Sequence, residues 1–244
     1  MTALIVFLAA ALLLLAFTFF RRKSPAVFRK IEAYERLNRA VGLAVEGGTR
    51  LHVSIGRGNL FTARWGSALA GLAMLRRLTE RTSISDHPPV VTSGDASLAI
   101  LSQDTLQSGY RAAGAEDQYR FTTGRLTGLT PFAFAAGTIP VMRDENVSAN
   151  VVIGDLGLEA ALLAEVADNQ ETDLIAASDN LTAQSVLYAS SQEPLIGEEL
   201  FAAGAYLGAG ASHEASLQAQ DVLRWLVILA ILGGAALKFL GIGF

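Results

Sequence analysis

Four turns in this sequence carry residue types that bind ions or phosphates. They cover residues 56–59, 93–95, 154–157 and 178–180, and each follows a short apolar run and precedes a helical pattern. The candidate ligand-binding residues are Gly56, Arg57, Gly58, Ser93, Gly94, Asp95, Asp155 and Asp179. The first turn offers glycines for close approach, backbone N–H groups and an arginine, which together suit an anion or phosphate. It lacks a Walker lysine and the full GxGxxG pattern, so it is a weak nucleotide signal.

The three aspartates in the later turns allow two interpretations. If Asp95, Asp155 and Asp179 converge at one edge of a sheet, their carboxylates could hold a hard cation such as Mg²⁺. An aspartate directly before a helix is also an ordinary N-cap. Asp95 begins a stretch similar to a metal-ion adhesion motif, but Ala99 replaces its second serine. We therefore favour caps over a metal site.

The sequence gives little support for catalysis. It has no cysteine, and its three histidines, His52, His87 and His213, match no metal-ligand spacing. It also has no nucleophile elbow. These observations predict a protein that is not an enzyme and has no cofactor, with a metal-dependent hydrolase as a remote alternative.

The elements that would position these turns form a repeated strand–turn–helix pattern. Strands are expected near residues 51–55, 89–92, 119–122, 149–153 and 173–177, and helices near 61–77, 96–113, 130–144 and 194–208. This alternation is typical of an α/β fold with a mostly parallel, Rossmann-like sheet and crossover helices. Residues 48–208 are predicted to form this domain.

Membrane-length apolar segments at residues 3–20 and 222–244 flank the domain, and residues 209–221 form a connector. The first segment spans about 27 Å at about 1.5 Å per residue. It has no basic residues before it and no cleavage pattern after it, which favours a retained helix over a signal peptide. The basic cluster Arg21, Arg22 and Lys23 follows at once. By the positive-inside rule, we expect the domain to be cytoplasmic and, if both segments span the membrane, both termini to lie outside.

Residues 24–46 show an amphipathic helical pattern. Ser24 and Pro25 would begin the helix, and apolar residues recur at three- and four-residue spacing. Arg29 and Lys30 extend the basic surface, so the helix could lie on anionic lipids. The alternative, which can coexist with the first, is a helix packed on the domain.

Charge is strongly polarised along the chain, although the whole carries only −4. Residues 45–125 hold nine basic and seven acidic residues, whereas residues 126–221 hold one basic and fourteen acidic residues. An acidic surface repels phosphate, so nucleic-acid binding is not expected. If the two regions form opposite faces, copies could meet head to tail in a ring, filament or lattice.

Three segments carry a family resemblance: PLIGEELFAAGAYLG from Pro194, SGDASLA from Ser93 and VVIGDLGLEAALLAEV from Val151. Over roughly residues 25–208 the chain resembles a bacterial membrane-protein family of unknown function. The resemblance implies an α/β domain at the bacterial plasma membrane and carries no activity. The leading hypothesis is thus a membrane-anchored, self-assembling structural or scaffold protein with an α/β interaction domain. The alternative is a membrane-bound small-anion or nucleotide-binding sensor or carrier.

Overall fold

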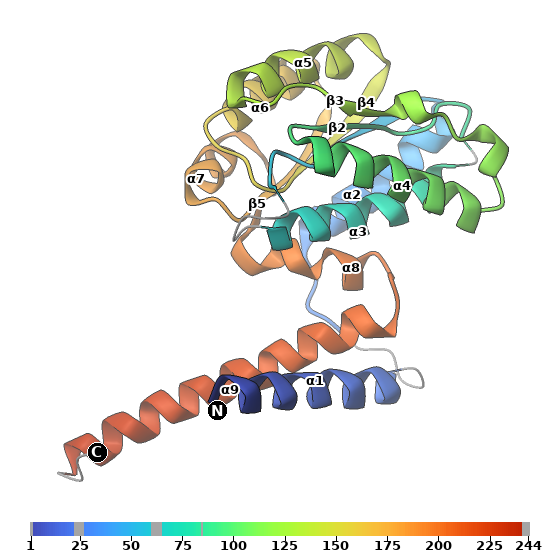
Figure 1. Ribbon diagram of the computed structural model, residues 1–244. Coiled ribbons are helices and arrows are strands. Elements are labelled where there is room, and N and C mark those ends of the chain that lie inside the picture. The colour runs from blue at the N-terminus through green and yellow to red at the C-terminus, as the bar shows by residue number, and fades with distance from the viewer. Residues whose placement is uncertain (1, 22–26, 60–64, 84, 241–244) are drawn as a thin grey trace. The chain divides into compact units, whose positions relative to one another are not determined.

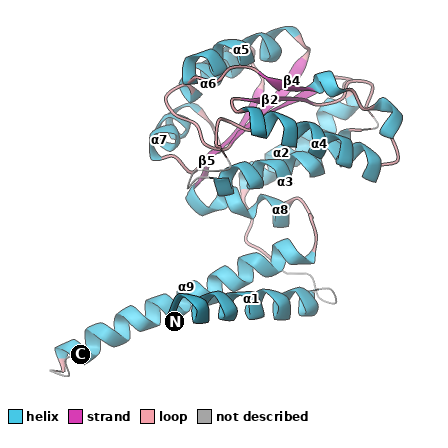
Figure 2. Ribbon diagram, viewed as in Figure 1, coloured by secondary structure: helices cyan, strands magenta, loops and turns pink. Residues whose placement is uncertain are grey.

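A computed structural model describes residues 2–21, 27–59, 65–83 and 85–240 of the chain. The chain forms two compact units, one from residues 30–207 and the other from residues 1–29 and 208–244. The larger unit contains the sheet and its covering helices, and it is described first (Figures 1 and 2).

The larger unit is built on a six-stranded parallel sheet, which confirms the predicted α/β class. The strands are β1 Arg50–Ser54, β2 Val90–Ser93, β3 Gly124–Leu126, β4 Val147–Ile153, β5 Asp173–Ser178 and β6 Leu195–Ile196. Their order is β3-β2-β1-β4-β5-β6. The chain therefore adds β2 and then β3 on one side of β1. It then returns to the other side of β1, where it adds β4, β5 and β6. The boundary between β1 and β4 is the switch point, where ligands bind in many such sheets.

Helices cover both faces of the sheet (Figure 1). They are α2 Glu32–Glu46, α3 Trp65–Thr82, α4 Ala96–Ala112, α5 Pro131–Asp144, α6 Ala160–Asn169, α7 Leu181–Ser190 and the short α8 Ala203–Tyr206. Two apolar clusters form the core, one on each face. In β4, Val151 and Ile153 belong to one cluster and Val152 to the other. This alternation explains the unbroken apolar run, because a strand covered on both faces buries every side chain.

Two predicted elements of the domain are wrong. Residues 119–122 are not a strand, because two 3-10 turns, Glu116–Gln118 and Phe121–Thr123, precede β3. The Thr123 hydroxyl donates to the Arg120 carbonyl at 2.6 Å and closes the second turn, so pairing with β2 begins only at Gly124. Residues 194–208 are not one helix either. Leu195 is buried as β6 against β5, and a 3-10 segment, Gly197–Ala202, separates it from α8.

The predicted helix over residues 24–46 begins later than expected. Residues 27–31 are described and are not helical, α2 starts at Glu32, and residues 24–26 lie outside the described residues. Its buried face consists of Ala33, Tyr34, Leu37, Ala40, Val41 and Ala44. These side chains belong to the main core, so α2 packs on the domain, as the second interpretation proposed.

The smaller unit consists of α1, Thr2–Arg21, and α9, Ala211–Phe239, which pack against each other. The predicted connector over residues 209–221 is helical from Ala211 onward and continues into the apolar segment without a break. Among the described helices, only α9 is both long and apolar enough to cross a membrane. The apolar stretch in α1, Val6–Phe20, is shorter than such a span.

Candidate functional site

Backbone hydrogen bonds join the turns at the switch point. The Arg57 N–H donates to the Asp155 carbonyl at 2.9 Å, and the Gly94 N–H donates to the Gly56 carbonyl at 2.8 Å. Gly56 has φ +65, and a Cβ there would lie 2.7 Å from the Asp155 carbonyl oxygen. Gly58 is buried in the same turn. Gly56, predicted to admit a ligand, thus allows one turn to approach another.

Arg57 is engaged inside the protein. Its Nε donates to Glu159 Oε1 at 2.9 Å, and the Glu159 side chain is only 2% exposed. The Arg57 side chain also lies over Gly94, where a Cβ would come within 2.2 Å of Arg57 Cγ. The predicted anion-binding arginine therefore neutralises a buried carboxylate, whose charge would be costly to leave unpaired.

Of the three aspartates, Asp95 is seen to cap a helix. Its carboxylate accepts from the Ser97 N–H at 2.8 Å and the Leu98 N–H at 3.2 Å, at the start of α4. Asn180, not Asp179, caps α7. Asn180 also donates to Asp155 at 3.5 Å. Ser93, the last residue of β2, is buried with its hydroxyl 3.3 Å from that of Ser102.

A metal site is not formed by these carboxylates. Among the described residues, no group of three histidine, cysteine, aspartate or glutamate side chains is placed to hold an ion. Asp95 accepts hydrogen bonds from the first turn of α4, and Asp155 accepts one from the Asn180 amide.

A buried polar chain crosses the centre of the sheet. His52 Nδ1 lies 2.9 Å from Asn150 Oδ1, and its Nε2 lies 2.8 Å from Thr92 Oγ1. Asn150 donates to Thr172 Oγ1 at 2.9 Å, and Thr172 donates to the Ala167 carbonyl at 3.2 Å. Burial lowers the pKa of His52 from 6.5 to about 4. When the neutral ring carries its hydrogen on Nδ1, Nδ1 donates to Asn150 Oδ1 and Nε2 accepts from the Thr92 hydroxyl, so both ring nitrogens are satisfied. His52 is therefore a packed core residue.

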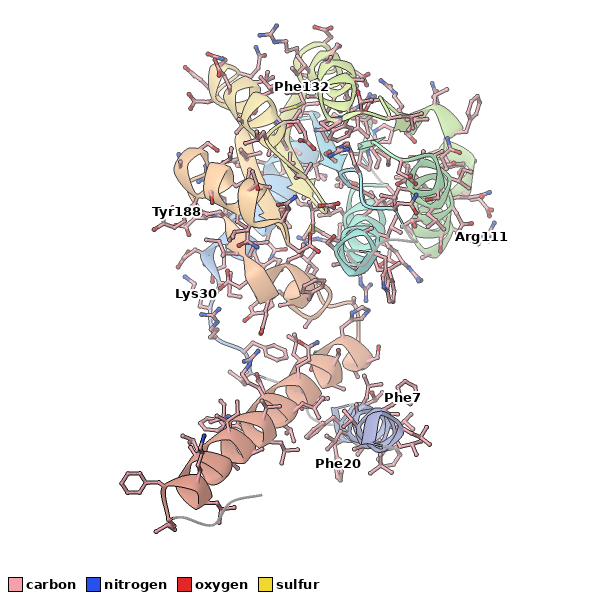
Figure 3. The ribbon with its side chains drawn as sticks, turned by 60° about the vertical axis from the view of Figure 1, so that its left-hand side comes forward. Phe7, Phe20, Lys30, Arg111, Phe132 and Tyr188 are labelled. Carbon is pink, nitrogen blue, oxygen red and sulfur yellow. The ribbon has the colours of Figure 1, made fainter. Side chains whose placement is uncertain are left out.

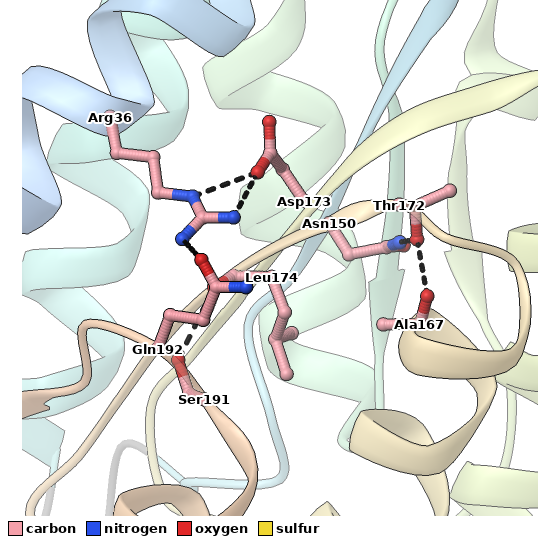
Figure 4. Close-up of polar contacts among 8 residues, drawn as sticks. All are labelled: Arg36, Asn150, Ala167, Thr172, Asp173, Leu174, Ser191 and Gln192. Carbon is pink, nitrogen blue, oxygen red and sulfur yellow. Dashed lines mark hydrogen bonds and ion pairs between the residues drawn. The ribbon is translucent and has the colours of Figure 1, made fainter.

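A second polar cluster holds α2 on the sheet (Figure 4). Arg36 donates from Nε and Nη2 to Asp173 Oδ1 at 2.8 and 2.5 Å, and from Nη1 to Gln192. Ser191 donates to the Leu174 carbonyl at 3.3 Å in the same region. These contacts join residues far apart in the sequence, and they give Arg36 a structural role.

Of the predicted membrane-surface residues, Arg22 and Lys23 lie outside the described residues, as does the side chain of Arg21. Arg29 and Lys30 are exposed just before α2. Lys30 pairs with Glu32 at 3.2 Å and Glu35 at 2.8 Å, and hydrogen bonding to Glu35 and Glu32 raises the pKa of Lys30. Its charge is thus partly balanced by the first turn of α2.

A cavity lies at the opposite edge of the sheet, where the strands begin. Its volume is about 590 Å³, and it is lined by Arg50, Ser85, Asp86, His87, Pro88, Asp117, Gln118, Arg120, Thr122, Thr123 and Arg125. We call this cavity the arginine pocket. The sequence carries no signal for this cavity, because in parallel sheets ligand sites are expected at the carboxyl ends of the strands. Its residues come from β1, β3 and two separate connections, and no local motif links them.

These observations define a class: a doubly wound α/β domain in a chain that also contains α9, an apolar helix of membrane-spanning length. The chain belongs to the family described as a domain of unknown function, DUF6754, whose model matches residues 1–243. No curated protein and no solved structure matches the chain.

Proposed function

We propose that this protein is a membrane-anchored, non-enzymatic scaffold that self-assembles through its α/β domain. The observation that carries this proposal is the strand order. It places β1–β3, from the more basic region, in one half of the sheet and β4–β6, from the acidic region, in the other. This order supports the proposal that polarity along the chain becomes polarity in space, which head-to-tail assembly requires.

Exposed apolar side chains at the two ends of the sheet support the same proposal. At the β3 end, Phe121 and Leu126 are 71% and 46% exposed. At the other end, Leu181 and Tyr188 of α7 are 76% and 72% exposed. Arg111, on α4 beside β3, and Tyr188 lie on opposite sides of the domain (Figure 3). We propose that the β3 end of the sheet in one copy contacts the α7 end of the sheet in a second copy. Charge would set the orientation of this contact, and apolar burial would supply affinity.

The membrane anchor in this proposal is α9, joined by α1. The helices pack together, and α1 carries exposed apolar residues such as Phe7 and Leu12. The basic residues after α1 support a cytoplasmic domain with both termini outside, in the bacterial plasma membrane. Anionic lipids would interact with these residues. Anchoring confines copies to one plane and one orientation, which lowers the entropic cost of association.

The experiment is a charge-swap complementation in mild detergent. One variant carries Arg81→Glu and Arg111→Glu in the basic half, and a second carries Glu165→Lys and Glu193→Lys in the acidic half. All four side chains are exposed. We expect the wild type to be oligomeric and each variant to be smaller by light scattering. An equimolar mixture should regain large particles, because each variant offers the other a complementary face. A monomeric wild type, or a mixture that does not recover, would refute head-to-tail assembly.

The alternative hypothesis, ligand binding at the switch point, has less support. Arg57 is paired with Glu159, and the surrounding turns are bonded to each other. An anion there would have to displace a buried carboxylate from its partner. We therefore do not assign a sensor or carrier function to residues 56–58.

A further inference from the structure

The arginine pocket has the size and chemistry of a ligand site. Its volume of about 590 Å³ lies within the range of small-molecule sites. Arg50 and Arg125 contribute guanidinium groups that are 19% and 35% exposed at the side chain. Arginine is suited to oxyanions, because its planar fork donates two parallel hydrogen bonds.

The charge of the arginine pocket is not balanced by its own ion pairs. Arg50 and Arg125 both pair with one carboxylate, Glu145, so this cluster keeps one positive charge. Arg120 is exposed and makes no ion pair with any described residue. It adds a second positive charge to the same wall. Together these groups favour a ligand that carries an oxyanion.

The same lining also contains Asp86 and Asp117, both exposed. Carboxylates accept hydrogen bonds and attract ammonium groups, and they repel a polyanion. We propose that the arginine pocket binds a small phosphate monoester that also carries an amino group. Its phosphate lies on the arginines, and its ammonium group lies beside Asp86 and Asp117. This site is at the amino ends of the strands.

The test is calorimetric titration of the full chain in mild detergent with three probes: phosphoethanolamine, inorganic phosphate and ethanolamine. We expect phosphoethanolamine to bind most tightly, because it alone meets both charges. Arg120→Gln should weaken its binding about tenfold, the effect of one charge-assisted contact. Asp117→Asn should remove the preference for phosphoethanolamine over inorganic phosphate and leave phosphate binding no weaker.

Arg76→Gln is the matched control, since Arg76 is an exposed arginine that pairs with Glu80 and does not line the pocket. It should bind phosphoethanolamine as the wild type does. The proposal is overturned if phosphoethanolamine does not bind at millimolar concentration, or if Arg76→Gln weakens binding as much as Arg120→Gln. The latter result would mean that only general surface charge attracts the probe. Particle size, measured on the same samples, separates this outcome from a failure of assembly.

Discussion

Acidification should destabilise the α/β domain through one buried residue, His52. Burial lowers its folded-state pKa from 6.5 to about 4, and both ring nitrogens already have partners in Asn150 and Thr92. The unfolded chain therefore takes up a proton at a higher pH than the folded chain does. The contribution to stability is complete above the unfolded pKa and is lost as the pH falls from 6.5 toward 4.

The expected magnitude follows from linkage. Between about pH 7 and pH 5, the unfolded state gains about 2 kcal/mol relative to the folded state from this single group. The measurement is urea unfolding of the full chain in mild detergent at several pH values. It is followed by Trp65 fluorescence in a Trp225→Phe background, so that only the α/β domain reports.

His52→Gln should lower stability at neutral pH and remove most of the slope between pH 7 and pH 5. His87→Gln is the control, because His87 is exposed and should leave the slope unchanged. If the wild type shows no slope in this window, or if His52→Gln keeps it, the assignment of the titration to the buried ring is wrong.

Substitutions at three further positions probe the switch-point turns and α5, each measured by the urea midpoint at neutral pH. Gly137→Ala should destabilise the domain by about 1–3 kcal/mol, because the alanine Cβ would lie 2.1 Å from the Thr127 carbonyl oxygen. This clash should outweigh the helix preference of alanine. A gain in stability would contradict this. Glu159→Gln should cost about 1–3 kcal/mol, since it leaves the partly buried Arg57 without its charged partner; an unchanged midpoint would show that the pair contributes little. Asp95→Ala should cost about 1 kcal/mol through loss of the α4 cap, and Asp95→Asn should recover most of it; equal loss in both would mean that charge, not capping, matters.

Local elements were predictable wherever neighbouring residues determine them. The apolar run at β4, the Asp95 cap of α4 and the apolar segment in α9 each depend on a few consecutive residues. The parallel class also followed, because strands separated by helices return in the same direction. The start of α2 at Glu32 and the short strands β3 and β6 were missed, because long-range contacts decide them.

The charge pairing at the switch point and in the arginine pocket is decided by the tertiary structure alone. Arg57 meets Glu159 across 102 positions of sequence, and Arg50 meets Glu145 across 95. The turn at residues 56–59 was predicted to bind an anion, but its Arg57 pairs with Glu159, a carboxylate distant in the sequence. The arginine pocket likewise exists only because β1 lies beside β2 and β2 beside β3, which brings their preceding connections to one edge. Local sequence specifies which residues can form a strand, turn or helix. Which charges meet is decided when the sheet is assembled, since burial of each ionic group requires a partner that only the complete fold supplies.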